Sequence, residues 1–169
     1  WSSDVCSSDL NALYEEGRKE SLENFEHIYA ILGTSFDLNF PESSVWKRGK
    51  EIIEDNPKIF EKSDGAIVFH GEKYGLHTRV FITREGLPTY EAKELGLAKI
   101  KHEEYGYDKS IVITANEVNE YFKVLLKSLS LIYPELAEKT HHIGHGFLRL
   151  PTGKMSSRKG DIITVESLR

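Results

Sequence analysis

Residues 109–150 contain a strand, a helix and a second strand in close succession, and this succession constrains the fold more than any other part of the chain. The segment KSIVITA carries an apolar run of strand length, which is typical of a strand buried in a parallel sheet. Asn116 can cap a following helix. The segment HHIGHGFLRL predicts the second strand. Between the two strands, apolar residues recur at helical spacing and stop before Pro134: Val118, Tyr121, Phe122, Leu125, Leu126, Leu129 and Ile132. The pattern therefore predicts a βαβ unit with a right-handed crossover, in a mostly parallel sheet of the nucleotide-binding type.

The residues before this unit predict further helices and a small antiparallel sheet. A second short helix is expected from Val45 to Asp55, and another after Pro88. The runs GAIVFHG and TRVFIT predict two strands joined by EKYGLH. Between Asn11 and Gly33, apolar residues spaced by three and four predict a first helix with one buried face: Leu22, Phe25, Ile28, Tyr29 and Leu32. The expected fold class is therefore α/β with an antiparallel elaboration.

Composition excludes several classes of protein. With 169 residues, 39% hydrophobic and 29% charged, the chain can bury one sizeable core. A net charge of -5 argues against a protein that mainly coats nucleic acid, although a local basic loop can still bind phosphates. No apolar run has the length of a membrane span and no secretory leader is visible, so we expect a cytoplasmic protein that does not bind membranes. The single cysteine, Cys6, fits a reducing compartment.

The opening ten residues differ from the rest of the chain. WSSDVCSSDL repeats a Ser-Ser-Asp block, and we expect residues 1–10 to be a non-native or disordered leader; a polar native linker is the alternative. The chain starts at Trp1, and its one methionine is Met155, so we expect a truncated piece. Residues 11–169 are then one partial domain.

The segment GKMSSRKGD combines cations, hydroxyls and flanking glycines in one loop. Lys154, Arg158 and Lys159 can neutralise the charge that develops on a departing pyrophosphate. Ser156 and Ser157 can hold the loop or donate to phosphate oxygens. The alternative is a solvated basic hairpin. The spacing is not that of a P-loop.

Longer stretches narrow the interpretation. The string KMSSR resembles the Lys-Met-Ser-Lys-Ser signature of class I aminoacyl-tRNA synthetases. In order along the chain, DGAIVFHGEKYGL, RVFITREGLPTYEAKELGLAK, ITANEVNEYFKVLLKSL and HGFLRLPTGKMSSRKGD resemble arginyl-tRNA synthetases. The resemblance runs from about residue 11 to the end. It implies the second half of a Rossmann-like parallel sheet with flanking helices, without the first half or the anticodon-binding domain.

The resemblance also implies roles for individual residues. The catalytic residues it indicates are Lys154, Ser156, Ser157, Arg158 and Lys159. For the substrate arginine it indicates Tyr90 and Glu94, with Glu117 as a further polar group. A carboxylate is the natural bidentate acceptor for a guanidinium. Two positions depart from the family: Glu94 stands where Asp is usual, and Val118 stands where Gln is common. We expect Val118 to belong to the apolar stripe, while its neighbours Asn116, Glu117 and Asn119 can replace the polarity of the glutamine. The alternative for the other two residues is that Tyr90 belongs to the core and Glu94 is a solvated helix charge.

The string His142-Ile143-Gly144-His145 looks like a second synthetase signature, but it lies in a strand and too close to the Lys-Met-Ser loop. The resemblance instead places it at the adenine pocket. The ATP-binding residues implied are His142, Gly144, Gly146, Lys154 and Met155. His145 also reads as an ordinary strand residue. We expect no metal site, because neighbouring side chains of a strand point to opposite faces.

The predicted function is that of an arginine–tRNA ligase fragment. Its substrates would be L-arginine, ATP with Mg²⁺, and tRNA(Arg), and the enzyme is expected to be monomeric. The alternatives are another class I synthetase or nucleotidylyltransferase, or a non-catalytic RNA-binding remnant. We expect the isolated chain to be inactive and, with exposed strand edges, prone to aggregate.

Overall fold

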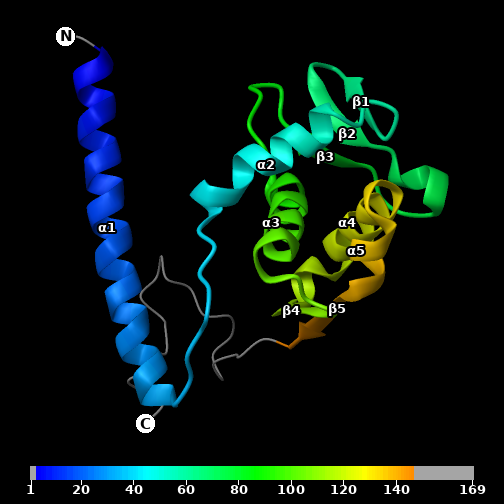
Figure 1. The fold of residues 1–169 in the computed structure, drawn as a ribbon. Coiled ribbons are helices and arrows are strands. Elements are labelled where there is room, and N and C mark those ends of the chain that lie inside the picture. The colour runs from blue at the N-terminus through cyan, green and yellow to red at the C-terminus, as the bar shows by residue number, and fades with distance from the viewer. Residues whose placement is uncertain (1–2, 147–169) are drawn as a thin grey trace, which may run out of the picture. The chain divides into compact units, whose positions relative to one another are not determined.

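The computed structural model describes residues 3–146 (Figure 1). The chain forms two compact units, and their described parts are residues 3–39 and 40–146. None of the helices in the described part combines the length and the hydropathy that a bilayer crossing requires. The Lys-Met-Ser loop, from Lys154 to Gly160, lies outside the described residues.

The described part of the first unit consists mainly of one long helix, α1 (Ser3–Leu32). Gly33, at φ 68°, ends the helix as predicted, and the backbone N–H of Thr34 donates to the carbonyl of Tyr29 at 3.0 Å. The helix begins eight residues before the expected start at Asn11. Most of the expected buried face is exposed, with Leu32 60% and Phe25 46% accessible, while Ile28 and Tyr29 are half-buried. Helical periodicity identifies a face that can be buried, but it does not supply the partner.

In the second unit, α2 (Glu42–Glu54) crosses α3 (Tyr90–Tyr105) at very close range. A β-carbon built on Gly49 would overlap the carbonyl of Ala92, and one built on Gly96 would overlap the carbonyl of Val45. The two backbones therefore touch because glycine stands at both crossing positions.

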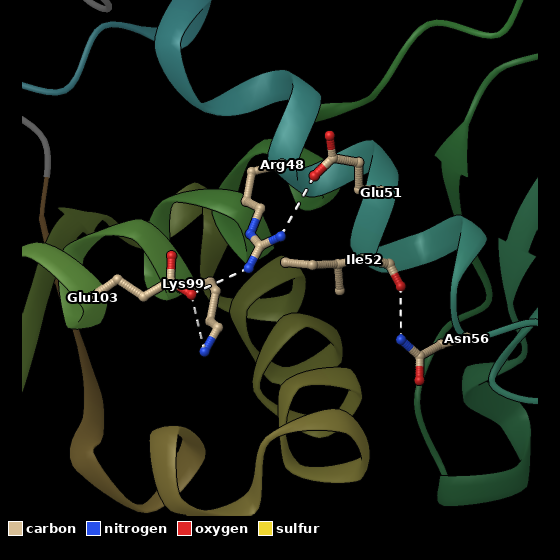
Figure 2. A network of polar contacts seen from close by, with 6 residues as sticks. All are labelled: Arg48, Glu51, Ile52, Asn56, Lys99 and Glu103. Atoms are coloured by element: carbon tan, nitrogen blue, oxygen red, sulfur yellow. Dashed lines mark hydrogen bonds and ion pairs between the residues drawn. The ribbon is translucent and has the colours of Figure 1, made fainter.

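Charged side chains extend the contact between these two helices along its solvent side (Figure 2). Arg48 of α2 donates to Glu103 of α3 at 3.1 Å and to Glu51 at 3.5 Å. Lys99 lies 3.2 Å from the same Glu103 carboxylate. The hydrogen bond from Lys99, more than any other contact, lowers the pKa of Glu103, and Arg48 adds to the effect. Exposed pairs of this kind contribute little to stability.

An antiparallel sheet follows α2 in the chain and has the order β1-β2-β3: β1 (Phe60–Ser63), β2 (Ala66–Phe69) and β3 (Arg79–Ile82). The last two strands confirm the predicted pair, and the short helix η1 (Gly71–Tyr74) lies between them. The first strand is an addition that the sequence reading missed. Asp64 and Gly65 both have positive φ, as a two-residue hairpin turn requires, and the Asp-Gly pair was the signal for it.

A parallel pair of strands completes the second unit. β4 (Ser110–Ala115) pairs with β5 (Thr140–His145) in the register Ser110↔Thr140 to Ala115↔His145. The connection runs through η2 (Asn116–Val118), α4 (Asn119–Ile132) and α5 (Pro134–Lys139). This confirms the βαβ unit and the α/β fold class with an antiparallel elaboration.

Two local expectations in this unit were wrong. Val118, not Asn116, occupies the N-cap position of α4, because a 3-10 turn intervenes, and no side chain caps the helix. The run KSIVITA is not buried on both faces: Ile111 is 55% and Ile113 65% exposed. In the described part of the chain, helices cover one face of this strand pair.

One hydrophobic core joins α2, the antiparallel sheet and the βαβ unit. Its rings lie close together, with Phe60 and Phe81 centroids 4.8 Å apart. The buried members of the core are Ile52, Ile53, Phe60, Phe69, Phe81, Ile82, Ala92, Leu95, Phe122, Val124, Leu125, Leu129 and Leu136. Val118 packs against this core, which confirms the expectation that it belongs to the apolar stripe.

Candidate functional site

The candidate site has two parts: the carboxyl ends of β4 and β5, and the first turns of α3. In open α/β sheets, ligands bind beyond the carboxyl ends of parallel strands. Ala115 and His145, the last residues of β4 and β5, lie side by side at that edge.

His142 is held firmly on the helix-covered face of the strand pair. Its ring stacks on Phe122 of α4, with centroids 3.9 Å apart and planes 1° from parallel. Its Nε2 lies 2.8 Å from the hydroxyl of Thr114 on the neighbouring strand. Burial lowers the pKa of His142, so the imidazole is neutral near pH 7. It can offer a hydrogen bond and one aromatic face to a ligand, but it brings no positive charge.

Gly144 leaves space for a side chain of α4. A β-carbon at this position would overlap the amide oxygen of Asn119. That oxygen is buried and has no hydrogen-bond partner among residues 3–146. Nothing lies within 4 Å of a β-carbon built on Gly146. The structure therefore distinguishes Gly144 from Gly146, which the sequence analysis grouped together. It also places Asn119, one of the polar neighbours of Val118, against Gly144.

The remaining histidines of this strand lie apart from His142. His141 and His145 are exposed, and Nδ1 of His145 lies 2.7 Å from the carbonyl of Gly146. Alternation along the strand accounts for this difference.

Hydrogen bonds from Thr89 to β3 fix the start of α3 against the antiparallel sheet, and they thereby position Tyr90. The backbone N–H of Thr89 donates to the carbonyl of Phe81 at 2.9 Å, and its hydroxyl donates to the carbonyl of Val80 at 2.9 Å. Gly86, at φ 76°, forms the turn between β3 and the helix. Tyr90 is the first residue of α3 and is 38% exposed.

Tyr90 and Glu94 are brought together, four residues apart on one face of α3. The Tyr90 phenol and the Glu94 carboxylate lie near enough to shift each other's pKa. Burial, followed by the nearby Glu94 charge, raises the pKa of Tyr90 to about 12. Burial also raises the pKa of Glu94, while Lys101 and the Tyr90 hydrogen bond act in the opposite direction. The pair is thus a half-buried acceptor with a phenol beside it.

Lys101 is a third member of this group, which the sequence reading missed. Its Nζ donates to the buried Ser110 hydroxyl, at the start of β4, at 3.1 Å. Burial lowers the pKa of Lys101, and the Glu94 charge opposes that effect. Glu94, Lys101 and Ser110 line a cavity of about 10 Å³. The spacing of seven residues from Glu94, two helical turns, was the available signal.

Glu117 is an exposed residue of η2, directly after β4. Its predicted part in binding arginine stays a prediction. Lys154, Met155, Ser156, Ser157, Arg158 and Lys159 lie outside the described residues, so their predicted roles also stay predictions.

Comparison with known proteins gives one consistent result. Residues 10–169 match the family described as tRNA synthetases class I (R), catalytic domain. Over 165 residues, the chain is 26% identical to an arginine–tRNA ligase of Amoebophilus asiaticus, covering 96% of this chain and 28% of that protein. Over 163 residues, it is 30% identical to an arginine–tRNA ligase of Bacteroides thetaiotaomicron, covering 95% of this chain and 27% of that protein. The chain thus spans between a quarter and a third of the length of these relatives.

The fold also has a counterpart among solved structures. The crystal structure of an arginyl-tRNA synthetase from Plasmodium falciparum matches 82% of this chain and 25% of its own, with a TM-score of 0.70 and 16% sequence identity. At this identity, the match concerns the fold.

Proposed function

Because this chain belongs to the class I tRNA synthetase (R) catalytic-domain family, we propose that it supplies part of the active site of an arginine–tRNA ligase. The observation that carries the proposal is that Tyr90 and Glu94 lie together, half-buried, on one face of α3. Because the chain spans only 28% and 27% of two relatives, we propose that it is a part of such an enzyme, namely the second half of the catalytic domain.

In this proposal the Tyr90–Glu94 pair binds the side chain of L-arginine. A guanidinium presents five N–H donors in a planar fork, and an ionised carboxylate accepts two of them at once. The half-buried position strengthens this interaction, because water screens it less. The longer Glu94, where relatives commonly have Asp, places its carboxylate one methylene further from the helix.

ATP enters as its magnesium complex, beyond the ends of β4 and β5. The neutral His142 ring and the backbone at Gly144 and Gly146 border the base, while Lys154 to Lys159 neutralise the phosphates. The enzyme joins the carboxylate of arginine to the α-phosphate, with release of pyrophosphate, and then transfers the arginyl group to tRNA(Arg), with release of AMP. Catalysis here consists of positioning the two substrates and stabilising charge on the phosphates. A cytoplasmic monomer remains our expectation for the whole enzyme.

The test uses a chimera: the arginine–tRNA ligase of B. thetaiotaomicron with its matching segment replaced by this chain. Arginine-dependent exchange of pyrophosphate into ATP is measured. We expect activity with arginine and none with a panel of other amino acids. Glu94→Gln removes the charge but keeps the shape, and we expect kcat/KM for arginine to fall by about 100-fold, as for the loss of a charged hydrogen bond of about 3 kcal/mol.

Glu104→Gln, an exposed change on the same helix, is the matched control and should leave kcat/KM unchanged. The 169-residue chain alone is expected to show no exchange. Normal arginine kinetics in the Glu94→Gln chimera would remove the assigned role of this residue. Exchange with another amino acid in place of arginine would favour a different class I synthetase.

A further inference from the structure

Lys101 places a positive charge behind Glu94 on the same face of α3. The two residues are seven positions apart, which is two helical turns. Both are half-buried, and both line the small cavity between α3 and the strand pair. The Lys101 ammonium is anchored at its far side by the hydrogen bond to Ser110, 3.1 Å away. Its position is therefore set by the packing of α3 on β4.

The charges around Glu94 come from two helices. Tyr90 and Lys101 face it from α3, and Glu42 acts on it from α2. Glu42 is itself paired with Lys93 at 2.5 Å. Tyr107 lies on the other side of Lys101, with its ring centroid 6.0 Å from the ammonium, and its phenol donates to the carbonyl of Ala98. Among the described groups that act on Glu94, Lys101 is the cation.

We propose that Lys101 is a positioning residue for arginine: its ammonium keeps the Glu94 carboxylate ionised beside Tyr90, ready to accept a guanidinium. This inference rests on the proposed binding of arginine by Glu94. An ionised carboxylate only accepts hydrogen bonds, whereas a protonated one presents an O–H toward the donors of the guanidinium. Burial without a counter-charge favours the protonated form.

The size of the cavity separates the role of Lys101 from that of the binding residues. A space of about 10 Å³ holds at most one water molecule, so the substrate side chain does not enter between Glu94 and Lys101. Tyr90 is 38% exposed, so the guanidinium approaches Glu94 from the Tyr90 side. Lys101 then acts through Glu94 and does not touch the substrate.

The first experiment measures the titration of the Glu94 carboxyl by carbon-detected NMR in the 169-residue chain. Lys101→Met keeps the length of the side chain but removes its charge, and we expect it to raise the pKa of Glu94. Lys101→Arg keeps the charge and should restore the original titration. Lys99→Met removes a charge from the same helix at its pairing with Glu103 and should leave Glu94 unchanged. An unchanged Glu94 titration in Lys101→Met, in a protein that remains folded, would overturn the proposal.

The second experiment follows kcat/KM for arginine against pH in the chimera. Below the pKa of Glu94 in the free enzyme, kcat/KM should fall about tenfold per pH unit. In Lys101→Met this fall should begin at a higher pH, while kcat/KM on the alkaline plateau stays close to that of the parent. A merely structural loss would lower the whole profile without moving it.

The two experiments distinguish this inference from the proposed function. If Glu94→Gln leaves arginine kinetics unchanged, the proposed function fails, whatever Lys101 does to the titration. If Glu94→Gln abolishes the use of arginine but the pH profile of Lys101→Met coincides with that of the parent, the inference alone fails.

Discussion

At the level of single residues, part of the candidate site depends on Asn119, whose side chain fills the space that a side chain at position 144 would need. Asn119 fits against β5 only because Gly144 has no side chain. In the described part of the chain, the buried amide oxygen of Asn119 has no hydrogen-bond partner, and an unsatisfied buried acceptor is costly in a folded protein. A residue that is retained despite such a cost is a candidate for a functional or positioning role. This pair therefore links the packing of the strand to the ATP-binding edge that we propose.

Gly144→Ala should destabilise the second unit by about 1–3 kcal/mol, because the new methyl group displaces the Asn119 side chain. Urea unfolding of the chain followed by far-UV circular dichroism measures this change. Asn119→Ala removes the obstructing amide. In that background, the added Gly144→Ala change should therefore lower the free energy of unfolding much less than it does in the parent.

Gly146→Ala is the matched control for this change, because nothing lies within 4 Å of the added carbon. It should change the free energy of unfolding by less than about 0.5 kcal/mol. Equal losses at Gly144 and Gly146 would show that strand conformation, and not the contact with Asn119, sets the requirement for glycine.

At the level of elements, the crossing of α2 and α3 fixes the turns of α3 that carry Tyr90 and Glu94, for which we propose arginine binding. Tyr90 and Glu94 lie on the same two turns of α3 that contact α2 through Ala92 and Gly96. The backbone contact allows no adjustment by side-chain rotation. A change at the crossing is thus transmitted to the site through the position of the α3 backbone.

Gly96→Ala should separate the two helices and destabilise the chain by about 1–3 kcal/mol, although alanine is intrinsically the better helix former. Thermal or urea unfolding tests this expectation. Gly17→Ala, in α1, adds the same methyl group where nothing lies within 4 Å and should not destabilise the protein. A Gly96→Ala variant as stable as the parent would mean that the helices can separate without cost.

At the scale of the whole molecule, apolar surface remains exposed on each described unit. On the strand pair, Ile113 and Ile143 are register partners with 65% and 50% exposure, and Ile111 lies on the same face. Parallel strands in folded proteins are covered on both faces. Within the first unit, α1 also exposes apolar residues, such as Leu13 at 66%. Such surfaces favour self-association when the chain is studied alone.

Replacing both Ile113 and Ile143 by threonine should reduce self-association of the isolated chain, because it removes apolar surface while keeping β-branched residues in the strands. Static light scattering at increasing protein concentration measures the effect. Val80→Thr changes an exposed apolar residue in the antiparallel sheet and serves as the control. If the double variant associates as strongly as the parent, another surface is responsible.

Local patterns in the sequence predicted the order and type of most elements and the βαβ connection, because these features follow from periodicity and turn chemistry. The choice of Tyr90 and Glu94 came from the resemblance to arginyl-tRNA synthetases and not from periodicity. The predicted elements did not include the strand β1, although the Asp64-Gly65 turn was a visible signal.

Only the tertiary structure decided which faces are covered and which polar groups meet. The stacking of His142 on Phe122, the fit of Asn119 against Gly144 and the anchoring of Lys101 by Ser110 all join different elements. Such contacts depend on the distances and crossing angles between elements, which result from packing the whole core at once. Local patterns carry no such distances. The sequence therefore locates the elements of the site, but it does not show which polar and charged side chains come into contact.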